Sequence, residues 1–212
     1  MSTTIDVYPM MGFMPLIEHT RSRTQELFQE LLDRHKIGSQ VEVRSCYYAT
    51  SEQTPHGMRW QPEMQLRFAY FLDGSICSSS FPYCLERPRA DALDVETFAN
   101  WHQETGYPPI MLGDVVPLEA CEFDGRLTEQ ELAIVNSQTH FWYEYRSACT
   151  HPVACTGYGL VAAALAEATN GVIASFDCAF EQPNGQKPDE FLSWWGDTQM
   201  QKYGAKWFRK ST

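Results

Sequence analysis

The chain has 212 residues and a formal net charge of −11, and 43% of its residues are hydrophobic while 20% are charged. A chain of this length and composition can bury a core of its own, which excludes a disordered chain and a small scaffold held by disulfides. No stretch approaches the roughly 18 consecutive apolar residues that a membrane-spanning helix needs. The apolar start of the chain has no basic residues before it and is interrupted by Pro9, Gly12 and Pro15, so it does not read as a signal peptide.

The first half of the chain predicts one helix followed by a β-hairpin. Residues 16–36 carry leucine and phenylalanine on one helical stripe, and Gly38 is expected to stop the helix. Residues 40–49 and 64–71 alternate between apolar and polar side chains, which is typical of strands. The dipeptide Asp73–Gly74 favours a tight turn, so residues 75–81 are expected to return as the partner strand.

The second half predicts helices and strands in mixed order, without a repeated strand–helix–strand unit. Helices are expected over 92–106 and 155–169, and two more are expected to begin at the capping box of Thr128 and Glu131 and at Pro188. Strands are expected over 115–123, 139–149 and 172–180. This order predicts an α+β fold with a mainly antiparallel sheet flanked by amphipathic helices. We expect one domain over 1–212, with a weak boundary near 82–93.

Acidic residues concentrate between Asp91 and Glu144. This span holds eleven acidic residues and a single basic one, Arg126, and so carries ten net negative charges. Such a segment repels nucleic acid and forms either an ordinary solvated surface or a surface that meets a basic protein. On the second interpretation we expect the contact to involve five acidic residues with two aromatic anchors: Glu119, Glu122, Asp124, Glu129, Glu131, Trp142 and Tyr143.

A cysteine nucleophile is the main enzymatic alternative. Cys155 is predicted near a helix start, where the helix dipole lowers the pKa of a thiol, as in papain-like hydrolases. His140 or His151 would have to act as the base, and Asp177 could orient it. The other interpretation is that Cys155 is a small apolar residue at a packing point.

Signals for metals and cofactors are absent from the sequence. The six histidines are scattered without HxH or HExxH spacing, and there is no glycine-rich phosphate motif. The seven cysteines are irregularly spaced without a CxxC pair, which favours reduced thiols and a cytoplasmic location. We therefore expect no metal, no cofactor and no membrane partner.

The stretch GVIASFDCAFEQPNG, residues 171–185, places Asp177 beside Cys178 in what reads as a strand. In a strand, neighbouring side chains point to opposite faces. Asp177 and Cys178 are therefore expected to be unable to act as a catalytic pair.

The block Leu160–Trp195 resembles the C-terminal part of bacterial immunity proteins that neutralise polymorphic or type VI secretion toxins. A helix of small residues is followed by a strand of the form I-x-S-x-D and a helix holding EFL-x-W. The matching residues are Gly171, Ile173, Ser175, Asp177, Ala179, Phe180, Phe191, Leu192 and Trp194, while Cys178 stands where the pattern has glycine.

The resemblance implies a non-catalytic protein that occludes the active site of a cognate toxin. Together with the acidic segment it favours a basic protein toxin as the partner. An accessory protein of a phage or mobile element, with a different partner, fits the same features.

Overall fold

A computed structural model describes residues 3–87, 118–146, 151–176 and 179–209. The strands are β1 (Thr3–Tyr8), β2 (Val41–Tyr47), β3 (Met64–Leu72), β4 (Ser75–Ser80), β5 (Tyr83–Glu86), β6 (His140–Arg146) and β7 (Val172–Ala174). The α-helices are α1 (Ile17–Arg34), α3 (Glu129–Ser137), α4 (Pro152–Thr169), α5 (Pro188–Leu192) and α6 (Trp195–Tyr203). Two 3₁₀ helices are η3 (Ala120–Phe123) and η4 (Ala205–Phe208). The expected helix over 92–106 lies outside the described residues.

The seven described strands form one sheet in the order β2-β3-β5-β6-β1-β7, and β4 also pairs with β3. Every pairing between these strands is antiparallel, which confirms the predicted α+β fold with an antiparallel sheet. β5 pairs with both β3 and β6, so the part of the 82–93 connection that is described lies inside the sheet.

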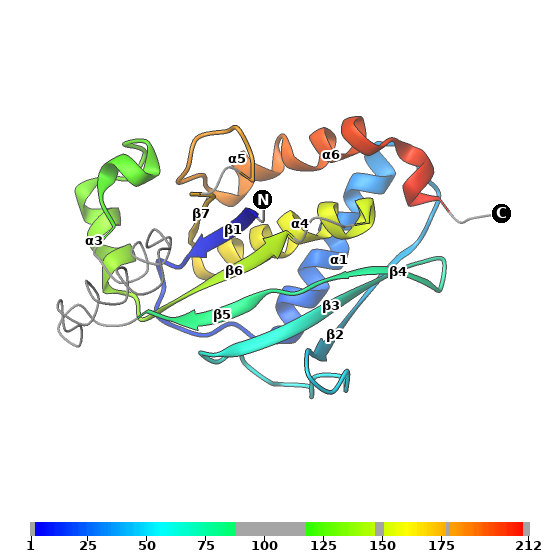
Figure 1. The fold of residues 1–212 in the computed structure, drawn as a ribbon, viewed down its shortest axis with the longest axis horizontal. Helices are drawn as coiled ribbons and strands as arrows, with labels where there is room; N and C mark the ends of the chain where they lie inside the picture. The colour runs from blue at the N-terminus through cyan, green and yellow to red at the C-terminus, as the bar shows by residue number, and fades with distance from the viewer. Residues whose placement is uncertain (1–2, 88–117, 147–150, 177–178, 210–212) are drawn as a thin grey trace, which may run out of the picture.

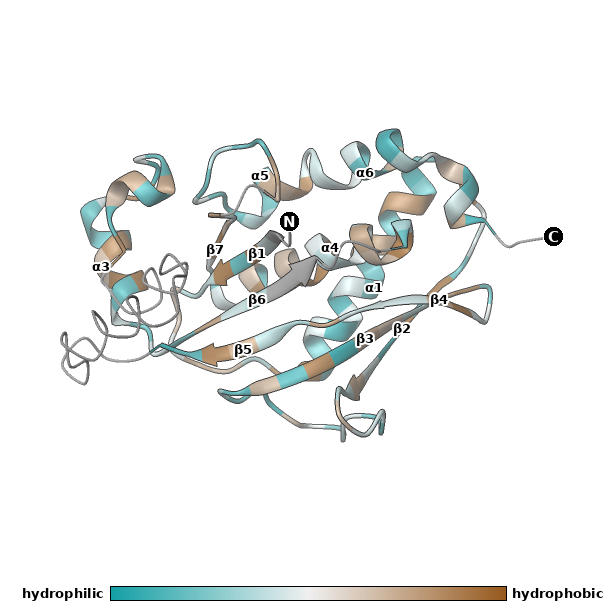
Figure 2. Cartoon of the chain, viewed as in Figure 1, coloured by the Kyte–Doolittle hydropathy of each residue, from teal (hydrophilic) through white to brown (hydrophobic). Residues whose placement is uncertain are grey.

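One face of the sheet is covered by α1 and α4 (Figure 1). Alternate residues of the strands point to this face, so Val7, Trp142 and Ile173 lie side by side on β1, β6 and β7. α4 is buried on nearly all sides because α1, α5 and α6 also pack on it, and hydrophobic colours are accordingly frequent along it in Figure 2. A helix that is apolar all round needs such a central position.

The opposite face is covered at one end of the molecule by η3 and α3 (Figure 1). Tyr8 is the centre of this second core cluster: its ring stacks on Phe141 at 5.5 Å and meets the edge of Phe123 at 5.6 Å. Val172 of β7 and Val135 of α3 also belong to this cluster, and both are fully buried. The fold therefore has helices on both faces at this end of the sheet.

The outer edge of β2 is capped by side chains of α1. The backbone amides of Val41 and Val43 donate to the side-chain oxygens of Gln29 and Gln25, both at 2.9 Å. An open strand edge can pair with another chain, and these two bonds occupy part of that edge.

The predicted hairpin and first helix are confirmed. Asp73 and Gly74 have φ values of 50° and 79°, the left-handed pair that a two-residue turn of type I′ requires. α1 ends one turn before Gly38, because the left-handed residue after it is Lys36 with φ 54°. The predicted role of Gly38 as the stop is therefore wrong.

Three other predicted elements differ from the structure. The described part of 115–123 is not a strand, because Glu119 and Glu122 cap a 3₁₀ helix that Asp124 ends with φ 53°. The strand predicted over 172–180 ends at Ala174, because the side chain of Asn184 accepts the hydrogen bond of the Ser175 amide at 2.8 Å. The helix from Pro188 is divided into α5 and α6 near Trp194, whose φ and ψ of −130° and −29° are not helical.

Within the described ranges, no helix is both long enough and apolar enough to cross a bilayer.

Candidate protein-interaction surface

The predicted acidic contact residues lie on the segment Leu118–Gln138, which we call the acidic unit. Two capping boxes shape it. The Glu119 amide donates to the Glu122 carboxylate at 2.6 Å, and the Thr128 amide donates to the Glu131 carboxylate at 3.0 Å. The second box confirms the helix start that the sequence predicts at Thr128.

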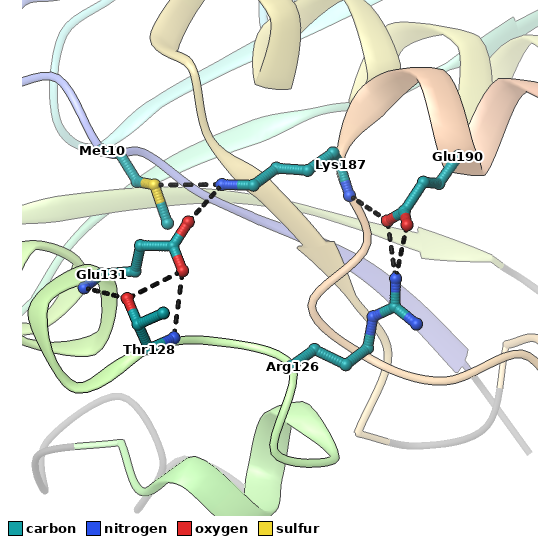
Figure 3. Close-up of polar contacts among 6 residues, drawn as sticks. All are labelled: Met10, Arg126, Thr128, Glu131, Lys187 and Glu190. Carbon is teal, nitrogen blue, oxygen red and sulfur yellow. Dashed lines mark hydrogen bonds and ion pairs between the residues drawn. The ribbon is translucent and has the colours of Figure 1, made fainter.

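Two ion pairs join the acidic unit to the segment before and within α5 (Figure 3). The guanidinium of Arg126 donates to the carboxylate of Glu190 at 2.7 Å, and the Lys187 ammonium lies 3.1 Å from the Glu131 carboxylate. Lys187 also lies 3.4 Å from the sulfur of Met10. No local sequence pattern marks these two ion pairs, because the partners lie far apart in the chain.

These contacts lower the pKa values of two carboxyl groups. Backbone hydrogen bonding at Thr128 and the bond from Lys187 lower the pKa of Glu131. The backbone amide of Lys187 and the side chain of Arg126 do the same for Glu190. Both groups are therefore anionic at neutral pH and engaged within the chain.

Asp124 and Asn184 make a third connection. The Asn184 amide donates to the Asp124 carboxylate at 2.7 Å, and its side-chain nitrogen donates to the Glu122 carbonyl at 3.2 Å. Because Asn184 also binds the Ser175 amide, it fixes the acidic unit to the end of β7.

The five predicted acids thus divide into two groups. Glu122 and Glu131 are half-buried, and Glu131 is neutralised by Lys187. Glu119, Asp124 and Glu129 are exposed, and the structure describes no hydrogen bond or ion pair for the Glu129 side chain. Arg126, the cation of this unit, is engaged by Glu190, so these exposed carboxylates have no neutralising partner within the acidic unit.

The two predicted aromatic anchors lie on opposite faces of β6. Trp142 is 1% exposed and packs edge-on against Trp60 and His140, so it cannot contact a partner and that prediction is wrong. Tyr143 is half-buried on the other face, with its ring against Tyr83 and Phe141. Alternation along the strand could have separated the two, since neighbouring residues cannot both face one partner.

Among the residues of the catalytic alternative, His151 and Cys155 lie one turn apart at the start of α4, where the Cys155 amide donates to the His151 carbonyl at 3.0 Å. Cys155 is 1% exposed in α4, and His151 caps that helix by accepting the Val153 amide at 3.3 Å. His140 is buried at the start of β6, where its ring packs edge-on against Trp142. Asp177 and Cys178 lie outside the described residues.

Thiol labelling of the native protein should reflect this burial. We expect Cys121, which is exposed, to react with iodoacetamide at least about tenfold faster than Cys155. Cys84 should be equally inert, because burial raises the pKa of its thiol. Peptide mapping by mass spectrometry measures each site, and equal rates at Cys155 and Cys121 would restore the cysteine-enzyme hypothesis.

His140 should make the protein less stable in mild acid. Burial lowers its pKa below the usual value near 6.5, and its Nε2 has no hydrogen-bond partner among the described groups. The unfolded chain therefore takes up a proton more readily than the folded one, so the free energy of unfolding falls as the pH drops below about 6.5. Urea unfolding between about pH 7 and pH 5 measures this slope. His140→Phe should reduce the slope and leave the contribution of His151, whose pKa burial also lowers; an unchanged slope would contradict the assignment.

Among the described residues, no group of three or more His, Cys, Asp or Glu side chains could hold a metal ion. Compared with known proteins, the chain matches no family model, no curated protein and no solved structure.

Proposed function

We propose that this chain is a non-catalytic cytoplasmic binding protein, an immunity protein that neutralises a cognate bacterial toxin by occluding its active site. Glu119, Asp124 and Glu129 on the acidic unit make the first contact with the toxin. Tyr143 is a secondary candidate on the same face of the sheet as the core beneath that unit.

The observation that carries this proposal is the unneutralised charge of the acidic unit. Arg126 is held by Glu190, while three carboxylates remain exposed. The unit is also fixed in place by two ion pairs and by Asn184, so its carboxylates are presented on a preorganised surface. A basic toxin is the natural partner, because opposite charges accelerate encounter and select the correct partner.

The resemblance of Leu160–Trp195 to immunity proteins supports the same function. That block forms the second half of α4, β7 and α5, and its residue Lys187 pairs with Glu131 of the acidic unit. The block Leu160–Trp195, which carries the resemblance, therefore holds the acidic unit in place through Lys187.

A pull-down from the native host, at low and at moderate salt, tests the proposal. We expect one stoichiometric basic protein that is harmful when expressed alone and harmless when co-expressed with this chain. A captured protein whose toxicity is unaffected by this chain would contradict an immunity function.

Reversing the exposed charges should weaken binding of the captured partner. The triple variant Glu119→Lys, Asp124→Lys, Glu129→Lys is expected to lose at least about tenfold in affinity and most of its salt dependence. The matched control reverses three exposed acids elsewhere for which the structure describes no ion pair, Asp33, Glu52 and Glu181, with the same change in net charge.

Calorimetric titration at two salt concentrations measures both triple variants, and thermal unfolding checks that each is folded. Equal losses in the two triples would show that only net charge matters. Such a result would remove the assignment of the contact to the acidic unit.

A further inference from the structure

A cleft of about 520 Å³ opens between the β1–α1 loop, the start of α1 and the end of α4. Its walls are mostly apolar and include Phe13, Met14, Leu16 and Ala168, while Arg59 and His19 supply the polar groups. This size and this combination, an apolar pocket with a few polar groups, are typical of sites for small organic ligands.

The wall that carries Arg59 is held rigidly against the loop. Leu16 and Arg59 form an antiparallel bridge, and the Trp60 amide donates to the Pro15 carbonyl at 3.0 Å. The Trp60 ring is buried and donates to the Thr20 hydroxyl at 3.1 Å. The guanidinium of Arg59 donates to the Met14 carbonyl at 2.7 Å, which uses one of its five N–H groups and fixes its direction.

The cleft has a cationic character because the charge of Arg59 is not neutralised. None of the residues that line it is acidic, and the structure describes no ion pair of Arg59. Two acids are adjacent in the chain to lining residues, and both are engaged elsewhere: Glu18 accepts the Gly57 amide at 3.1 Å and pairs with His56, and Glu167 pairs with Arg23 at 2.6 Å. The last carbonyl of α4, on Thr169, already accepts the amides of Met10 and Met11.

A second cleft, of about 330 Å³, provides a contrast within the same molecule. Its lining includes Arg21 and Arg44 but also Glu18 and Glu42; Arg44 is paired with Glu42 at 2.6 Å, and Glu18 with His56. Its charges are therefore balanced, and it offers no comparable preference for an anion.

We propose that the cleft at Arg59 binds an organic carboxylate with an apolar body. The free N–H groups of Arg59 hold the carboxylate, and a ring nitrogen of His19 donates a second hydrogen bond. Phe13, Leu16 and Ala168 contact the apolar body. This site is separate from the acidic unit and does not depend on the proposed immunity function.

Titrations of the protein with three small probes, followed by backbone amide chemical shifts, test separately whether binding needs the ligand's negative charge and its apolar body. The probes are 4-phenylbutyrate, its uncharged amide and butyrate. We expect 4-phenylbutyrate to shift the resonances of the β1–α1 loop at millimolar concentration, and both other probes to bind at least about tenfold more weakly. Equal binding of the acid and the amide, or no shift with any probe, would overturn the proposal.

Three variants locate the site. Arg59→Gln should weaken the binding of 4-phenylbutyrate by about tenfold. Ala168→Leu should fill the cleft and prevent binding without changing any charge. Arg44→Gln, in the balanced cleft, is the control and should leave binding unchanged. Binding that survives both Arg59→Gln and Ala168→Leu in folded protein would show that the ligand lies elsewhere.

A peptide arm distinguishes two sources of the same chemistry. Acetyl-Gly-Phe with a free carboxylate is compared with its amide and with 4-phenylbutyrate. Tighter binding of the peptide acid than of 4-phenylbutyrate identifies a chain terminus as the source, and the reverse identifies a small metabolite. Both results support the site. Equal affinities of the peptide amide and the peptide acid would overturn the proposal.

Discussion

Replacing Gly159 with alanine is expected to lower the free energy of unfolding by about 2 to 4 kcal/mol. A Cβ atom at this position would lie 2.2 Å from Cε2 and 2.3 Å from Nε1 of Trp195. The Trp195 ring cannot yield easily, since it is 1% exposed and its Nε1 donates to the Thr156 carbonyl at 3.0 Å. Alanine favours helix by about 1 kcal/mol over glycine, which offsets only part of the clash.

Two further glycines make the experiment decisive. Gly157→Ala should also destabilise, because its Cβ would lie 2.2 Å from the buried Tyr70 ring. Gly38→Ala should be neutral, because nothing lies within 4 Å of its Cβ and its backbone is not left-handed. Urea unfolding of the three variants measures the difference. A Gly159→Ala protein as stable as Gly38→Ala would show that α4 does not pack this closely on Trp195.

The elements that the sequence predicted well are those whose signals are local. The Asp73–Gly74 turn needs two left-handed residues, and the capping box of Thr128 and Glu131 lies within one helical turn. The helix stripe of α1 is likewise confirmed: Leu27, Phe28, Leu31 and Leu32 are all buried. In each case the residues that determine the structure lie within a few positions of one another.

The elements that the sequence predicted poorly depend on contacts with residues far along the chain. β7 ends where Asn184 takes the Ser175 amide, which no pattern around residue 175 could show. η3 lies within the stretch 115–123 that the sequence predicts as a strand, yet Leu118 and Phe123 both pack into the cluster around Tyr8. The charge of the acidic segment was visible in the sequence, whereas its division into exposed and half-buried carboxylates depends on how the acidic unit packs and on Lys187, which pairs with Glu131.

Asn136 is the residue that fastens the start of the acidic unit. Its side-chain oxygen accepts the Leu118 amide at 2.8 Å, and its nitrogen donates to the Leu118 carbonyl at 2.9 Å. The guanidinium of Arg87, which is 8% exposed, reaches the same oxygen at 3.4 Å and the Val135 carbonyl at 2.9 Å. Asn136 thus holds together Arg87 and Leu118, the described residues on either side of 88–117.

Replacing Asn136 with alanine is therefore expected to cost about 2 to 4 kcal/mol, because it leaves buried polar groups of Leu118 without partners. Asn136→Asp should cost less, since it keeps an acceptor for the Leu118 amide and adds a charge opposite Arg87. Ser137→Ala, at the exposed neighbouring position, is the control and should be neutral. Urea unfolding gives the three free energies, and hydrogen exchange at the Leu118 amide reports the local bond. If Asn136→Ala matched Ser137→Ala in both measurements, the acidic unit would have to be held by Lys187, Arg126 and Asn184 alone.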